Sequence, residues 1–153
     1  METKKVKNYT NIPEIELKYK SGKVKKINIT SSQDAEKIFR EFFDCDTLEL
    51  TESFVVIYLN RANKTLGWQR VSQGGITGTI VDKRLILATA LKCAATGIIL
   101  AHNHPSGNIN PSNTDKELTK QLKEASKLLD IVVLDHLIIS EDNYFSFSDE
   151  GLM

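Results

Sequence analysis

Residues 97–115 have the sequence Gly97-Ile-Ile-Leu-Ala-His102-Asn-His104-Pro-Ser-Gly-Asn-Ile-Asn-Pro-Ser112-Asn-Thr-Asp115. The apolar start of this stretch is typical of a buried strand. Side chains two positions apart in a strand point to the same face, about 6.5–7 Å apart. The sequence therefore predicts that His102 and His104 converge at the end of this strand, where both rings can bind one metal ion.

Asp115 follows the two histidines after a loop rich in Pro, Gly and Asn, at the point where a helical pattern begins. Together His102, His104 and Asp115 offer three nitrogen and oxygen ligands and leave a fourth tetrahedral position for water. Structural zinc sites are instead closed by four protein ligands, usually including cysteines. The pattern therefore predicts one catalytic Zn²⁺ per chain.

Each half of this pattern also has a simpler explanation. A His-x-His pair at a strand end can be a hydrogen-bonded pair, and Ser112-x-x-Asp115 before a helix can be a capping arrangement. The two signals joined by one tight loop are more specific than either and favour the metal site. A cap contributes only about 1 kcal/mol, so we expect metal binding by Asp115 to prevail over capping.

The spacing His102-x-His104, seven residues, Ser112-x-x-Asp115 resembles the metal-binding motif of the MPN (JAMM) metalloprotease superfamily. The string His102-Asn-His-Pro-Ser-Gly107 is similar to the RadC branch of that superfamily. The resemblance runs from about Glu52 to the C-terminus, about two-thirds of the chain, and includes Leu134-Asp-His-Leu-Ile-Ile139. It implies an α/β fold related to the cytidine deaminases, with a mixed β-sheet flanked by helices, and zinc-dependent cleavage of peptide or isopeptide bonds.

The resemblance also implies roles for two residues beside the metal. Glu52, just before the first predicted core strand, matches the base that takes a proton from the attacking water, with Glu49 as the alternative. Ser112 matches the serine that hydrogen-bonds the oxyanion of the tetrahedral intermediate. By itself, a glutamate at the entrance of a strand is usually a solvated charge, and Ser112 also suits the N-cap of the following helix.

A second class of function stays open, a non-catalytic metal-containing module that binds DNA or a protein partner in DNA repair or recombination. The RadC branch was named for DNA repair, and its longer members carry an N-terminal helix-hairpin-helix module. We expect no such module here, because the sequence has no room for it, and DNA binding is weakly supported. Cytidine deaminase chemistry requires His-x-Glu and Cys-x-x-Cys, and neither occurs in the sequence.

The composition is typical of a single soluble domain, with 153 residues, 41% hydrophobic and 26% charged. Twenty basic and twenty acidic side chains cancel, so the whole chain has no general attraction to nucleic acid. Residues 1–26 nevertheless hold eight lysines and three glutamates. This segment can contact phosphates or an acidic surface, although lysines alternating on a solvated hairpin explain it better.

Neither export nor membrane insertion is indicated. Cys45 and Cys93 are too few for a disulfide framework, and no apolar stretch approaches 18 residues. We therefore expect a cytoplasmic protein with no membrane association. The sequence does not determine its oligomeric state.

The resemblance implies a RadC-type MPN/JAMM domain over residues 46–153, preceded by an N-terminal hairpin-helix extension over residues 1–45, and we expect the two to form one compact unit. The extension is predicted to contain a β-hairpin of residues 15–19 and 24–29, followed by a helix from Ser31 or Ser32 to about Phe43. The larger part is predicted to contain strands 53–59, 66–72, 97–101, 132–139 and 144–147 and helices 83–95 and 113–129.

Two further predictions concern the C-terminal part. The last helix is expected to bury Leu118, Leu122, Ala125 and Leu129. Asp135 and His136 lie next to one another in a predicted strand, so their side chains point to opposite faces and cannot both enter one site. We interpret His136 as a packed histidine or a support for the metal ligands, not as a ligand itself.

Overall fold

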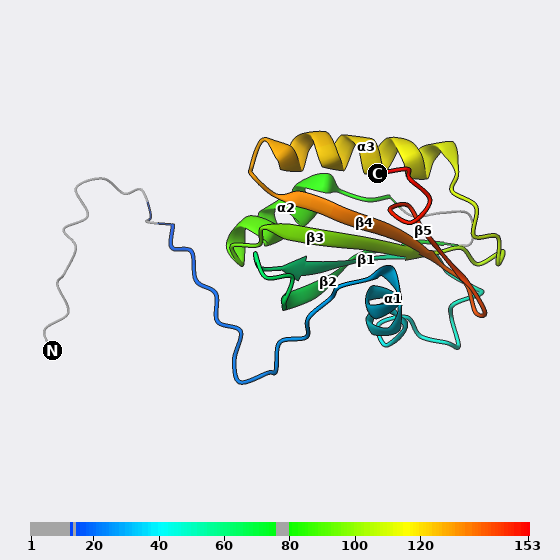
Figure 1. The fold of residues 1–153 in the computed structure, drawn as a ribbon, viewed down its shortest axis with the longest axis horizontal. Helices are drawn as coiled ribbons and strands as arrows, with labels where there is room; N and C mark the ends of the chain where they lie inside the picture. The colour runs from blue at the N-terminus through cyan, green and yellow to red at the C-terminus, as the bar shows by residue number, and fades with distance from the viewer. Residues whose placement is uncertain (1–12, 14, 76–79) are drawn as a thin grey trace, which may run out of the picture.

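A five-stranded mixed sheet forms the centre of the computed structural model, which describes residues 13, 15–75 and 80–153 (Figure 1). In this part of the chain the elements are α1 (Ser32–Arg40), β1 (Ser53–Leu59), β2 (Thr65–Gln73), α2 (Lys83–Lys92), β3 (Gly97–Asn103), α3 (Asn113–Lys127), β4 (Val132–Ile139) and β5 (Tyr144–Ser146). The strand order is β2-β1-β3-β4-β5. The predicted α/β class, with a mixed sheet flanked by helices, is confirmed.

Helices cover both faces of the sheet, with α2 and α3 on one face and α1 on the other (Figure 1). Phe54, Val56 and Tyr58 of β1 pack towards α2 and α3, whereas Val55 and Ile57 pack towards α1. All residues of β1 and β3 are buried as a result. This two-sided burial explains why both strands have nearly continuous apolar sequences.

The connection from β3 through α3 to β4 positions the predicted ligands. β3 and β4 are parallel, and parallel neighbours require a crossover, usually a helix. Ser112 is the N-cap of α3, and its side chain accepts a hydrogen bond from the backbone N–H of Asp115. The first turn of α3 therefore follows closely after the carboxyl end of β3, which carries His102.

The helices end earlier than the sequence predicted, whereas β1 and β4 have the predicted bounds. The last helical residues of α1, α2 and α3 are Arg40, Lys92 and Lys127. Ala94 and Asp130, soon after α2 and α3, have positive φ angles of 53° and 55°. A residue in the left-handed region ends an α-helix, which explains the shorter α2 and α3.

The inward face of α3 is also more polar than predicted. Its buried residues are Asp115, Thr119, Leu122 and Ser126. Leu122 was predicted correctly, whereas Leu129 is 40% exposed. The prediction from hydrophobic spacing placed the buried face of α3 about one residue away from where it lies. It gave no weight to polar side chains, which can also be buried when they have hydrogen-bond partners.

The predicted N-terminal β-hairpin was wrong. Residues 15–20 and 23–27 belong to no strand, and the segment makes one isolated bridge, between Asn28 and Lys64, in the part of the chain that the structure describes. Ile15 and Val24 are 94% and 80% exposed. A two-stranded hairpin is marginally stable without a core to cover, and these apolar side chains face none.

Within the described ranges, no helix combines the length and the apolar character that crossing a membrane requires. The longest helix described, α3, has 15 residues and presents several charged side chains.

The packing of α1 yields a stability test. Phe39 of α1 is completely buried against the sheet. We expect Phe39→Ala to lower the free energy of unfolding by about 3–5 kcal/mol, through lost burial and a residual cavity. Leu17→Ala is the control, because Leu17 is 71% exposed and its loss should change stability by less than about 0.5 kcal/mol. Urea denaturation measures both, and equal effects would contradict the packing of α1.

Candidate metal centre

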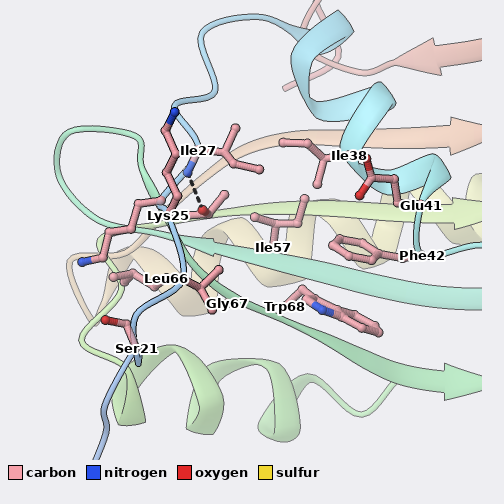
Figure 2. Close-up of a pocket in the computed structure, with 13 residues that line it drawn as sticks. Ser21, Lys25, Ile27, Ile38, Glu41, Phe42, Ile57, Leu66, Gly67 and Trp68 are labelled. Carbon is pink, nitrogen blue, oxygen red and sulfur yellow. Dashed lines mark hydrogen bonds between the residues drawn. The ribbon is translucent and has the colours of Figure 1, made fainter.

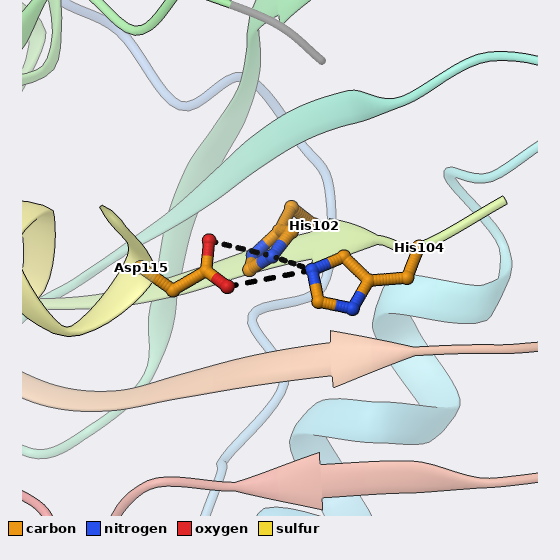
Figure 3. Close-up of side chains that lie close together, drawn as sticks. All are labelled: His102, His104 and Asp115. Carbon is orange, nitrogen blue, oxygen red and sulfur yellow. Dashed lines mark hydrogen bonds and ion pairs between the residues drawn. The ribbon is translucent and has the colours of Figure 1, made fainter. Parts of the chain in front are cut away.

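The three predicted ligands come together at the carboxyl end of β3 (Figure 3). His102 is in the strand, His104 lies just beyond it, and Asp115 is in the first turn of α3. One nitrogen of each histidine and one carboxylate oxygen of Asp115 all lie within 4.8 Å of one another. The Nε2 atoms of His102 and His104 are 2.9 Å apart, and Asp115 Oδ1 lies 3.2 Å from His102 Nε2.

Strand alternation explains how these side chains are directed. His102 shares the α3-facing side of the sheet with Phe54, whose ring stacks at a centroid distance of 6.0 Å. The backbone N–H of His104 donates to the carbonyl of Ile139, 3.3 Å away, which continues the extended backbone past the end of β3. The two imidazoles therefore meet on one side of the sheet, as their spacing predicted.

Asp115 serves the helix cap and the cluster at once. Its Oδ2 accepts hydrogen bonds from the backbone N–H and the hydroxyl of Ser112, at 2.7 and 2.6 Å, while Oδ1 faces His102. The expected competition between capping and metal binding does not arise in this arrangement. A carboxylate has two oxygens with about four lone pairs, so one oxygen is held by the cap and the other stays available.

Ser112 is exposed at the N-cap of α3. Its hydroxyl donates to Asp115 Oδ2. The hydroxyl oxygen of Ser112 also accepts a hydrogen bond from the backbone N–H of Asp115, at 3.1 Å. The hydroxyl proton is thus committed to the carboxylate. To serve an oxyanion, the role that the family resemblance implies, the hydroxyl has to rotate away from Asp115.

The charges in the cluster favour an ionised Asp115. Burial opposes ionisation, but hydrogen bonds from His102 and His104 outweigh it and hold the pKa of Asp115 far below its usual value. The hydrogen bond to Asp115 in turn raises the pKa of His104, against the opposing effect of burial. The cluster therefore presents a negative charge, which suits a cation.

Glu52 is half-buried directly before β1 and lies in the electric field of this cluster. Burial raises the pKa of Glu52, while the charges of His102 and His104 lower it and that of Asp115 raises it further. A raised carboxyl pKa is closer to the range in which a general base works at neutral pH. Glu49, the alternative, is exposed, so the geometry favours Glu52.

Asn103 holds the loop that carries Glu52, a role that the sequence analysis missed. Its side-chain amide donates to the carbonyls of Leu48 and Thr51, at 2.7 and 2.9 Å, and its oxygen accepts from the N–H of Ser53 at 2.8 Å. The sequence could have indicated the orientation of Asn103, because the residue between two ligands in a strand must point to the opposite face of the sheet.

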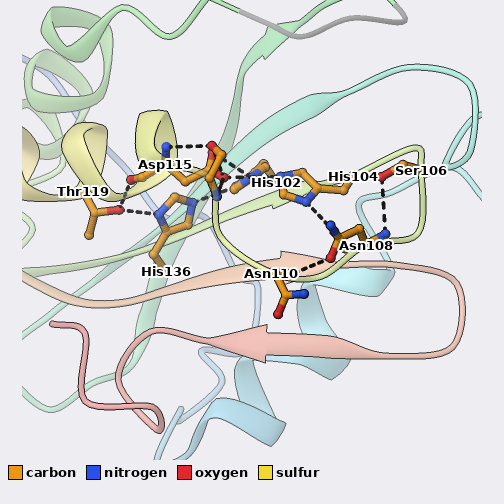
Figure 4. Close-up of polar contacts among 9 residues, drawn as sticks. His102, His104, Ser106, Asn108, Asn110, Asp115, Thr119 and His136 are labelled. Carbon is orange, nitrogen blue, oxygen red and sulfur yellow. Dashed lines mark hydrogen bonds and ion pairs between the residues drawn. The ribbon is translucent and has the colours of Figure 1, made fainter.

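His136 lies behind His102 and is completely buried (Figure 4). Its Nε2 is 2.8 Å from Nδ1 of His102, and its Nδ1 is 2.6 Å from the hydroxyl oxygen of Thr119. Burial, followed by the charge of His102, lowers the pKa of His136 well below its usual value, so the ring is neutral. The prediction of a buried supporting histidine is confirmed, whereas Thr119 was not foreseen.

Asp135, the neighbour of His136, points to the opposite face of the sheet, as alternation predicted. Its carboxylate accepts hydrogen bonds from the hydroxyl of Ser146 and the N–H of Ser148, at 2.6 and 2.9 Å. It therefore stabilises the turn after β5 and takes no part in the ligand cluster.

The donor set fits a zinc ion. Nδ1 of His104 bonds the carbonyl of Asn108, and a carbonyl only accepts, so this nitrogen carries a proton in every protonation state of the ring. Metal binding requires a neutral ring, and the proton lost is then the one on Nε2. That atom faces a ring nitrogen of His102 at 2.9 Å, beside the carboxylate of Asp115, and such a set of nitrogen and oxygen donors fits a zinc ion. His104 is partly exposed, so water can reach the cluster.

A separate apolar cavity of about 230 Å³ lies between α1, β2 and the 21–27 segment (Figure 2). Phe42 and Trp68 form one wall as a stacked pair with centroids 4.2 Å apart. Its lining includes neither His102, His104, Asp115 nor Glu52. This cavity is therefore distinct from the ligand cluster.

Comparison with known proteins identifies relatives of the whole domain. The model of a family described as "RadC-like JAB domain" matches residues 29–152. A UPF0758 protein of Flavobacterium johnsoniae is 50% identical over 131 residues, 85% of this chain and 55% of its own length. A UPF0758 protein of Aquifex aeolicus is 41% identical over 140 residues, 92% of this chain and 58% of its own length. The chain thus spans little more than half of each of these relatives.

The Asn103 contacts predict the effect of an isosteric change. Asn103→Asp replaces the amide donor by an oxygen that faces the carbonyls of Leu48 and Thr51. We expect the free energy of unfolding to fall by about 1–3 kcal/mol, because two buried acceptors lose their donor. Asn143→Asp, the same change at an exposed position, is the control. Chemical denaturation at pH 7 should separate the two, and similar stabilities would refute the role of Asn103.

Proposed function

This chain belongs to the RadC-like JAB domain family, and from that premise we propose that it is a zinc-dependent hydrolase of peptide or isopeptide bonds. His102, His104 and Asp115 hold the metal in this proposal. The observation that carries it is the convergence of two imidazole nitrogens and one carboxylate oxygen within 4.8 Å, with the half-buried Glu52 in their field.

Zinc supplies a Lewis acid at this position, which lowers the pKa of water to about 7 and polarises a carbonyl. Glu52 takes the proton from the attacking water and returns it to the leaving amine. The raised pKa of Glu52 supports the first step, since burial makes its carboxylate a stronger proton acceptor than an exposed one. The exposed hydroxyl of Ser112 turns from Asp115 Oδ2 towards the substrate and donates to the oxyanion.

A non-catalytic module that binds DNA or an acidic protein surface is the second candidate. The observation that favours it is a set of exposed lysines in the extended segment before α1, Lys18, Lys20, Lys23, Lys25 and Lys26. DNA binding through these lysines would weaken steeply with salt, whereas hydrolysis at the cluster does not require them.

The metal site predicts a difference between two neighbouring substitutions. We expect purified untagged protein, equilibrated with zinc and freed of excess, to retain about one ion per chain, because a three-ligand site binds zinc tightly. Asp115→Ala should lose this zinc. Ser112→Ala is the control, because it removes the cap but none of the three ligands.

Elemental analysis measures the zinc content of all three proteins. Absence of zinc from the unmodified protein would refute the hydrolase proposal. Equal loss in both variants would assign the effect to the helix cap instead of the ligand.

Glu52→Gln separates binding from catalysis. The amide cannot accept the proton of water, so we expect zinc to be retained and hydrolysis to fall by about 100-fold or more. Glu49→Gln, a matched change at an exposed glutamate of the same loop, should keep its activity. Initial rates on peptide and lysine isopeptide substrates provide the comparison, and an active Glu52→Gln protein would exclude Glu52 as the base.

A further inference from the structure

A chain of buried hydrogen bonds runs from α3 through β4 to the metal-site face of β3 (Figure 4). The hydroxyl of Thr119 lies 2.7 Å from the carbonyl oxygen of Asp115 and 2.6 Å from Nδ1 of His136. Nε2 of His136 lies 2.8 Å from Nδ1 of His102. Thr119 is 2% exposed and His136 is 0% exposed, so no water competes for these contacts.

The far end of the chain sets the direction of every bond in it. The carbonyl of Asp115 can only accept, and a threonine hydroxyl has one proton to give. The Thr119 proton therefore points to Asp115, four residues back on the same helix. The Thr119 oxygen is left as an acceptor, and the bond to His136 requires the proton to be on Nδ1 of that ring.

The same reasoning carries through the two histidines. His136 is 0% exposed and its hydrogen-bond partners are a hydroxyl and another imidazole, so the buried ring holds a single proton. Nδ1 holds that proton, so Nε2 is bare and accepts from Nδ1 of His102. His102 then carries a proton on Nδ1, away from the cluster. Its Nε2, which faces His104 and Asp115, is the atom that can offer a lone pair.

We propose that Thr119 and His136 are positioning residues that hold a proton on Nδ1 of His102, so that Nε2 is directed to the metal as a ligand. The relevance to zinc rests on the proposed function, whereas the proton positions follow from the hydrogen bonds alone. Histidine ligands of metals commonly donate their other ring N–H to a fixed acceptor, and losing that acceptor typically costs 10–100-fold in metal affinity.

Both ends of this series of hydrogen bonds lead to Asp115. The backbone carbonyl of Asp115 anchors Thr119, and the carboxylate of Asp115 faces the ring that the chain orients. The other ligand, His104, has a simpler anchor, since its Nδ1 bonds the carbonyl of Asn108 directly. Both histidines are thus oriented by a backbone carbonyl, one directly and one through two side chains.

Thr119→Val tests the proposal through zinc affinity. It removes the hydroxyl and nearly keeps the shape, so we expect the zinc dissociation constant to rise by about 10–100-fold. Thr119→Ser, which keeps the hydroxyl, should restore most of the affinity. Ser126→Ala is the matched control, because Ser126 is another buried hydroxyl of α3 that bonds the carbonyl of Lys123.

Nitrogen-15 NMR of the histidine rings provides a second measurement that needs no zinc, made on the unmodified protein and on Thr119→Val. In the zinc-free protein we expect the His136 proton on Nδ1 and a proton on Nδ1 of His102. In Thr119→Val we expect the His136 proton to move towards Nε2, because Nδ1 has lost its acceptor.

A proton on Nε2 of His136 in the unmodified protein would overturn the proposal, as would unchanged zinc affinity in Thr119→Val. These results are distinguishable from failure of the hydrolase proposal. A protein that binds no zinc still reports the proton position of His136, and the NMR result alone decides the role of Thr119 and His136 in that case.

Discussion

The parallel pairing of β3 with β4 is the constraint on which the candidate metal centre depends. It requires a crossover, and α3 provides it, so the first turn of α3 starts near the carboxyl end of β3. Burial of both faces of β3 fixes the alternation of its side chains. His102 therefore points towards α3 and its neighbour Asn103 points the other way, to the loop that carries Glu52.

Asp115 connects the stability of α3 with the chemistry of the site. Its Oδ2 closes the capping box with Ser112, its Oδ1 faces His102, and its carbonyl anchors Thr119. A loss of the Asp115 side chain is consequently a loss of a cap, a ligand and a counter-charge together. The capping bonds to Oδ2 also prevent free rotation of the carboxylate, which keeps Oδ1 directed at His102 and Oδ2 at His104.

The sequence predicted those features of the structure that depend on neighbouring residues, and missed those that depend on contacts between distant segments. The strands Ser53–Leu59 and Val132–Ile139 were predicted with their bounds, because apolar runs buried on both faces have a strong local signature. The prediction of a hairpin at residues 15–29 was wrong. Alternating polar and apolar residues show that a segment can form a strand, but not that the rest of the protein offers a hydrophobic surface for it to cover. The ligand set came from spacing and resemblance, whereas Thr119 and Asn103 depend on the register between elements far apart in the sequence.

The buried stripe of α3 indicates that this helix is adapted to the site as well as to the core. Three of its four buried residues are polar, Asp115, Thr119 and Ser126. A polar group without a partner in the interior costs about 1–3 kcal/mol, so such a stripe persists only where every member is satisfied. Asp115 and Thr119 are satisfied by the ligand cluster and by His136. Apolar residues at those two positions would pack as well and would leave His136 and His102 without their partners, so the polarity of the stripe is explained by the histidines that it orients.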